Sequence, residues 1–110
     1  MTLRDDRITA NEIMFREVNE RIDELAERTS TVAMLDYVCE CGQPECTGKI
    51  PMTAPEYEAV RTDGQRFVTL PGHQTTTLER VVESNDRYQI VEKSDDDAAQ
   101  HAEATDPRSN

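Results

Sequence analysis

Tryptophan is absent from this chain of 110 residues, and other aromatic side chains are few, with three tyrosines and two phenylalanines. Hydrophobic residues make up only 35% of the sequence, less than in an average soluble protein. A core built from so little apolar material is modest, and small domains of this kind often use a metal ion to supplement packing. The length allows one domain at most.

Positive charge is also scarce, because 12 basic residues face 23 acidic ones and leave a formal net charge of −11. Such a surface repels phosphate backbones and anionic membranes, so we expect no direct binding to nucleic acid or membranes. No run reaches the ~18 consecutive apolar residues of a membrane span, and the N-terminus lacks the apolar run of a signal peptide. We therefore expect a cytoplasmic protein whose partner is another protein.

A fourth cysteine is missing, and the three that are present lie close together at Cys39, Cys41 and Cys46. Cytoplasmic thiols are kept reduced, so clustered cysteines there favour metal ligation over a disulfide. Free or redox-active thiols are the alternative. Glu40 and Glu45 lie between the cysteines, and we expect both to be solvated loop carboxylates because thiolate and imidazole sites rarely need them.

The fourth ligand of a tetrahedral zinc site must come from elsewhere in the chain. His73 follows a Pro-Gly turn between two expected strands, where a side chain can be aimed inward. His101 lies in an acidic tail, and ordering that tail would cost entropy. We therefore predict one structural zinc ion with four protein ligands and no open position for a substrate: Cys39, Cys41, Cys46 and His73.

Apolar residues three and four positions apart predict a long helix over residues 10–28. Thr9 and Glu12 fit a capping box at its start, which leaves 1–8 as a flexible lead-in. The helix is too short for its repeats to show whether the apolar stripe packs on the domain's own sheet or forms a seam with a second copy or a partner. The stripe comprises Phe15, Val18, Ile22 and Leu25.

The other faces of this helix carry many acidic residues. Because the bulk of the chain is acidic as well, a partner with a basic surface would suit it. We predict three partner-binding residues on this acidic face: Glu20, Glu24 and Glu27. A homodimer through the same helix is the other arrangement that the pattern allows.

The rest of the chain predicts a small, mostly antiparallel sheet with one short helix. Thr53 and Glu56 form a second capping box, and the helix that it begins should end near Gly64. From residue 94 onwards, five acidic residues face one arginine, which predicts a disordered acidic tail over 94–110. Strands are expected over 32–38, 49–52 and 66–70, with a hairpin formed by 78–83 and 87–92.

The fold class is therefore α+β, with one zinc-stabilised domain over 9–93. Several stretches of it together resemble a family of small uncharacterised bacterial proteins. The resemblance spans nearly all of 10–93, matches all four proposed ligand positions and implies no particular activity, but it implies that His73 belongs with the cysteines. It is carried by 10–12, 15–22, Cys39-Glu40-Cys41-Gly42, Cys46, 56–61, 66–67, Pro71-Gly72-His73, 79–82 and Tyr88.

No catalytic constellation accompanies the predicted zinc site. A Gly-rich phosphate loop, a His-Glu helix pair and a serine elbow are all missing, so we lean away from an enzyme. We expect a protein-protein interaction or regulatory module stabilised by zinc. The alternative is a zinc-thiolate redox or metal-responsive switch, because zinc-bound thiolates can be oxidised and the loss of zinc would unfold the loop.

Overall fold

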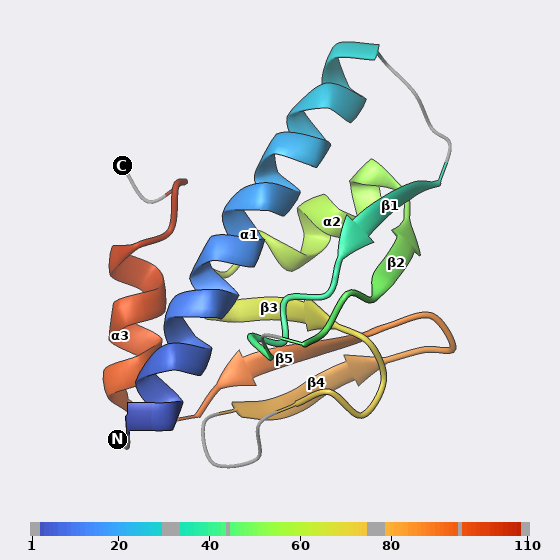
Figure 1. Ribbon diagram of the computed structural model, residues 1–110. Helices are drawn as coiled ribbons and strands as arrows, with labels where there is room; N and C mark the ends of the chain where they lie inside the picture. The colour runs from blue at the N-terminus through green and yellow to red at the C-terminus, as the bar shows by residue number, and fades with distance from the viewer. Residues whose placement is uncertain (1–2, 30–33, 44, 75–78, 95, 109–110) are drawn as a thin grey trace.

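The computed structural model describes residues 3–29, 34–43, 45–74, 79–94 and 96–108. Among these residues, three helices and five strands are arranged as the predicted α+β fold (Figure 1). No helix of the described part is long and apolar enough to cross a membrane. In chain order the elements are α1 (Leu3–Thr29), β1 (Leu35–Val38), β2 (Lys49–Met52), α2 (Ala54–Val60), β3 (Arg66–Thr69), β4 (Glu79–Ser84), β5 (Gln89–Lys93) and α3 (Asp96–Ala104).

The strands form two antiparallel sheets rather than the single small sheet that we expected. β1 pairs with β2, while β5 lies between β3 and β4. Helix α1 crosses beside both sheets, and α3 lies along its N-terminal half (Figure 1). The predicted hairpin is confirmed, because β4 and β5 pair directly and Asn85 Oδ1 accepts hydrogen bonds from the backbone N–H groups of Arg87 and Tyr88 in the turn.

The main core joins both sheets to α2 and to the cysteine loop. Tyr37 from β1 stacks on Tyr57 from α2, with ring centroids 4.7 Å apart. Ile50, Val68 and the first two cysteines belong to the same buried cluster. Helix α2 begins at Ala54 with the predicted capping box, in which the side chains of Thr53 and Glu56 each accept the other residue's backbone N–H.

Helix α1 begins seven residues earlier than predicted, so the expected flexible lead-in is helical from Leu3. The capping box at Thr9 is wrong because both of its residues lie inside the helix and are buried. The carboxylate of Glu12 does not reach back to a backbone N–H but forms an ion pair with Lys93 of β5. The sequence does contain the pattern of a capping box, but Lys93 binds the Glu12 carboxylate instead.

The inward face of α1 is polar, which the apolar stripe did not predict. Glu12, Arg16 and Asn19 are fully buried there. Val18 is instead 42% exposed and Leu25 60% exposed. Of the predicted stripe, only Phe15 and Ile22 are half-buried, and Ile22 packs against the main core.

The prediction of disorder over 94–110 is wrong, because Asp96–Ala104 form helix α3. Its buried face consists of Ala98, Ala99 and Ala102, and side chains this small let the helix lie close to its neighbours. Ala102 clusters with Phe67 and Val91, and its carbonyl oxygen accepts a hydrogen bond from Arg16. Low apolar content predicted disorder, but the alanine face, the bond from Arg16 and ion pairs of Asp106 and Arg108 hold this segment against the domain.

Candidate metal centre

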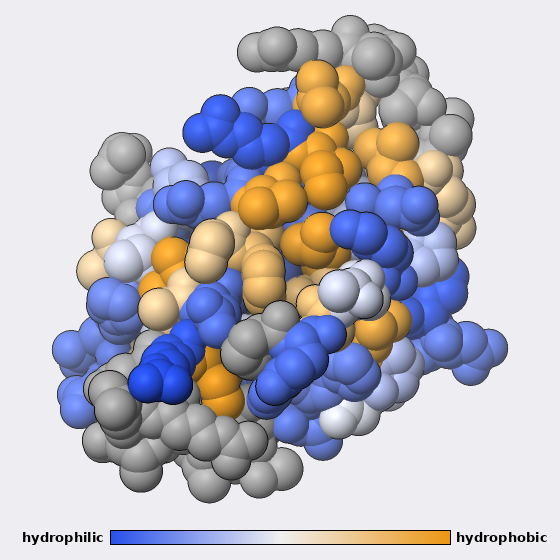
Figure 2. Space-filling view, in the orientation of Figure 1, coloured by the Kyte–Doolittle hydropathy of each residue, from blue (hydrophilic) through white to orange (hydrophobic). Residues whose placement is uncertain are grey.

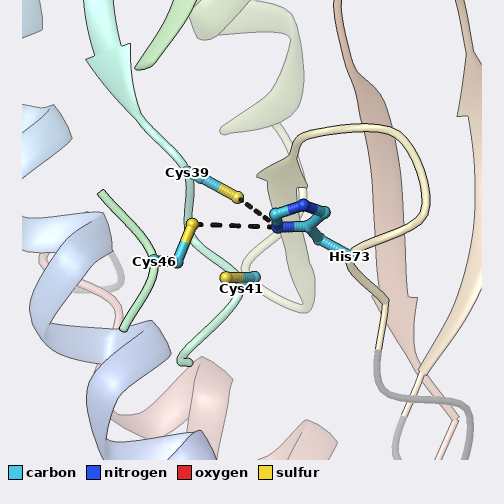
Figure 3. A group of neighbouring side chains, drawn as sticks. All are labelled: Cys39, Cys41, Cys46 and His73. Atoms are coloured by element: carbon cyan, nitrogen blue, oxygen red, sulfur yellow. Dashed lines mark hydrogen bonds between the residues drawn. The ribbon is translucent and has the colours of Figure 1, made fainter. Parts of the chain in front are cut away.

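The structure brings together the four side chains that the sequence predicted as ligands. Their ligand atoms all lie within 4.8 Å of one another. The sulfur atoms of Cys39 and Cys46 are each 3.7 Å from Nδ1 of His73. Figure 3 shows the side chains converging from the loop after β1 and from the turn after β3. Three sulfurs and one imidazole at these distances can hold a single metal ion.

The cysteine loop reverses tightly because a glycine allows it to. Gly42 has φ of +77°, and a Cβ at this position would lie 2.5 Å from the carbonyl oxygen of Ile8. Any other residue would therefore be strained and would also collide with α1. Beyond the glycine, the N–H of Cys46 donates to the carbonyl of Gln43, and the N–H of Cys39 donates to the carbonyl of Gly48, which fixes both ends of the loop.

The end of β3 delivers the histidine and also supports a cysteine. The backbone N–H of His73 donates to the carbonyl of Leu70 at 3.1 Å, closing the predicted turn. Gly72 has φ of +83° with open space around its Cα, so its role there is conformational. The N–H of Leu70 donates to the sulfur of Cys39 at 3.2 Å. One short segment therefore positions two of the four candidate ligands.

The electrostatics of the cluster favour a thiolate at Cys41. A hydrogen bond from the Cys39 thiol lowers the pKa of Cys41 to about 5, and the backbone N–H of Gln43 and the side chain of His73 act in the same direction against burial. The same thiol pair, together with burial, raises the pKa of Cys39. A deprotonated sulfur beside further soft donors is the form that binds zinc.

Two asparagines of α1 hold the backbone of the cysteine loop, and the sequence analysis missed both. Asn11 donates to the carbonyl of Gly42 at 2.9 Å. Asn19 exchanges two hydrogen bonds with the backbone of Val38, at 2.7 and 2.8 Å, immediately before the first cysteine. Their spacing of eight residues places both on one side of the helix, which was the signal available in the sequence.

The expectation for Glu40 is wrong, because this carboxylate is fully buried rather than solvated. It accepts hydrogen bonds from the Asn19 side chain at 2.7 Å, the Tyr57 hydroxyl at 2.9 Å and the Val68 backbone at 3.0 Å. Burial raises its pKa, although these bonds oppose the rise. Successive side chains of an extended backbone point in opposite directions. Cys39 and Cys41 point to the candidate site, so Glu40 between them points away from it. Glu45 is exposed, as expected.

The predicted partner-binding carboxylates differ in their surroundings. Glu20 pairs with Arg61 and Arg108, and its side chain is only 12% exposed. Glu24 is exposed, and the side chain of Glu27 lies outside the described residues. Glu20 is therefore largely engaged within the protein. The rejected ligand candidate His101 is exposed on α3, outside the four-residue cluster.

Comparisons with known proteins leave this cluster to be interpreted from its own chemistry. No protein-family model matches the chain, and searches of curated proteins and of solved structures find no match.

Proposed function

We propose that this chain is a small zinc-binding protein with a structural Cys3His site, and that it acts as a protein-protein interaction module in the cytoplasm. The observation that carries the proposal is the convergence of three sulfurs and one imidazole within 4.8 Å. Four protein ligands complete a zinc tetrahedron and leave no position for a substrate, which supports a structural role. Reduced thiols in such a cluster suit the cytoplasm.

Zinc in this site would order more than its own loop. Two of the ligands, Cys39 and Cys41, belong to the main buried cluster. The loop backbone is also held to α1 by Asn11 and Asn19. Loss of the metal would therefore loosen the packing of α1, which links the metal site to the surface of that helix.

The outward side of α1 is the surface that we assign to a partner. Met14, Val18 and Leu25 are each at least 42% exposed there, and Figure 2 shows hydrophobic side chains gathered along this helix. Exposed Glu17 and Glu24 lie beside them. A matching partner would present an amphipathic segment with apolar residues flanked by lysine or arginine. A second copy, with a formal net charge of −11, would be repelled.

Elemental analysis of purified protein tests the metal assignment, with about one zinc per chain expected for a single four-ligand site. Replacement of His73 with alanine should lower zinc retention as much as Cys46→Ser does. His101→Ala is the matched control, because this histidine is exposed outside the cluster, and it should retain zinc fully. A wild-type protein that is purified without metal and gains no stability from added zinc would refute the site.

Site-specific photo-crosslinking in the source cells tests the partner surface. A photoreactive amino acid at position 18 or 25 should crosslink to one protein through a segment rich in lysine or arginine. The same amino acid at position 59, which is exposed on α2, is the control and should not give this product. A crosslink only to another copy of the chain would identify a homodimer instead, and no product at either helix position would refute the surface.

A further inference from the structure

A hollow beside the metal centre makes one side of the cysteine cluster accessible. It has a volume of about 210 Å³, and its lining includes Cys39, Cys46, Phe15 and Val38, together with 47–49. Cys46 is half-buried, whereas Cys41 is fully buried and does not line the hollow. Two of the three sulfur-bearing residues therefore meet a space that a small molecule can enter.

We propose that Cys46 is a peroxide-sensitive thiol that forms a disulfide with Cys39, and that this step releases the metal. The inference concerns regulation of the same centre and so rests on the zinc site proposed above. Cys46 is the first point of attack because it is the most exposed of the three cysteines. The volume of the hollow, about 210 Å³, is large enough to admit a small, uncharged oxidant such as hydrogen peroxide.

The chemistry balances with peroxide as the only co-reactant. The Cys46 thiolate attacks one peroxide oxygen, the O–O bond breaks, and the departing hydroxide takes a proton to become water. The Cys39 thiolate then attacks the sulfur of the resulting sulfenic acid, forming the S–S bond and releasing a second hydroxide, which is also protonated. The two sulfurs together lose two electrons, and one peroxide is reduced to two waters.

The geometry favours Cys39 as the resolving residue. Both it and Cys46 line the hollow, and their sulfurs lie no more than 4.8 Å apart. A disulfide bond of about 2 Å requires a closing movement of less than about 3 Å. Rotation of the half-buried Cys46 side chain can supply that movement while its backbone stays in place, because the neighbouring Glu45 and Thr47 are exposed and leave room around it. Cys41 is held in the core and offers no comparable freedom.

The sequence allows the disulfide to be mapped without ambiguity. Glu40 separates Cys39 from Cys41, and Glu45 separates Cys41 from Cys46. Zinc-loaded protein would be treated with hydrogen peroxide, its remaining thiols alkylated in denaturant, and the chain cut after glutamate for mass spectrometry. We expect the fragments that contain Cys39 and Cys46 to be joined and Cys41 to be alkylated. A disulfide that includes Cys41, or irreversible oxidation of the thiols without any disulfide, would overturn the proposal.

A change in the wall of the hollow tests access without touching a ligand. Phe15→Trp should fill part of the space and slow disulfide formation several-fold at unchanged zinc content. Met14→Trp is the matched control, because Met14 is 53% exposed and does not line the hollow. Equal oxidation rates in both variants would overturn the route.

A colorimetric zinc indicator, followed during the peroxide reaction, separates this inference from the proposed function. Zinc release in step with disulfide formation supports both. Formation of the Cys39–Cys46 disulfide in protein that is purified without zinc and gains no stability from added zinc would refute the metal site and retain the thiol pair. Zinc that stays bound while the disulfide forms would overturn metal release.

Discussion

Helix α1 reverses the usual arrangement of an amphipathic helix, because its buried face is polar and its exposed face is apolar. The inward face carries Glu12, Arg16 and Asn19, all fully buried, whereas the outward face carries Val18 and Leu25, both exposed. The inward side chains are not a generic apolar surface, because each has an assigned partner on another element. The outward ones are instead open to solvent, at 42% and 60% exposure. The difference separates residues that fix the position of the helix from residues that form an exposed apolar surface.

Polar contacts on the inward face specify one position for the helix. Arg16 donates to the carbonyls of Gly64 and Ala102, both at 2.9 Å, while its guanidinium lies 4.7 Å from the centre of the Phe67 ring. A shift along the helix axis would leave these groups unpaired, at a cost of about 1–3 kcal/mol each. A hydrophobic stripe tolerates such a shift more easily. We infer that the inward face contributes positional accuracy at some expense of stability.

The largest effect on this comparison should come from Lys93→Met. The ammonium group of Lys93 is fully buried between the carboxylates of Glu12 and Glu79. Its removal leaves buried carboxylates without their cation, and we expect a loss of about 3–5 kcal/mol in the free energy of unfolding, measured with denaturant. Arg80→Met, at a side chain that is 68% exposed, is the control. Equal losses of unfolding free energy in the two variants would contradict the view that buried charges fix the position of the helix.

Asn19→Ala should cost less, about 2 kcal/mol, because it removes the partners of Val38 and one partner of Glu40. It should also weaken zinc retention, because these bonds fix the backbone beside Cys39. Competition with a zinc chelator measures that retention. Glu17→Ala, on an exposed position of the same helix, provides the matched control. Unchanged zinc retention in Asn19→Ala would show that the metal site does not depend on the helix.

The C-terminal contact should have a smaller and pH-dependent effect. Arg108 forms ion pairs with Glu20, Asp23 and Glu58, and its hydrogen bonds to Glu58 are the main reason that the pKa of that carboxyl is lowered. Removal of this partly exposed arginine in Arg108→Ala should cost up to about 1 kcal/mol.

A lowered pKa in the folded state contributes stability above the ordinary carboxyl pKa and loses it on acidification. The difference in unfolding free energy between wild type and Arg108→Ala should therefore shrink as the pH falls below 4.5, the unshifted pKa of Glu58. Parallel denaturant titrations at several pH values measure it. A difference that is constant across this range would contradict a role for carboxylate charge.

The outward face should give the smallest change in stability. Val18→Asp and Leu25→Asp place charges on exposed positions, so the free energy of unfolding should change by less than about 0.5 kcal/mol. Zinc content should also be unchanged, whereas the crosslink to a partner should disappear. Thermal melting and elemental analysis provide the first two readouts. Strong destabilisation would show that the apolar stripe packs internally after all.

Local chemistry accounts for what the sequence predicted well. The capping box at Thr53, the turn between 83 and 87, the Pro-Gly turn before His73 and the clustering of cysteines all depend on neighbours within a few residues. These signals identified α2, the hairpin and the four residues that converge at the candidate metal centre.

Most of the failures share a dependence on distant partners. Glu12 resembled a capping residue until Lys93, 81 positions away, was brought beside it. Glu40 resembled a loop carboxylate because its partners Asn19, Tyr57 and Val68 come from three other elements. Helix α3 was missed because alanines carry little hydrophobic signal in a sequence. The periodicity of apolar residues located the apolar stripe of α1. Which face of the helix is buried depends on the distant partners of its polar residues.

The hydrogen bond between Arg16 and Ala102 also limits how early the chain can complete its fold during synthesis. Its two ends are 86 positions apart, so at a synthesis rate of about 5–20 residues per second the arginine is added to the chain on the order of ten seconds before its acceptor. Long-range closures of this kind slow folding, because the entropy of a large loop is lost before the contact forms. During that interval α1 can already contact β1 and the cysteine loop, but the acceptor that Arg16 finds on α3 is still missing.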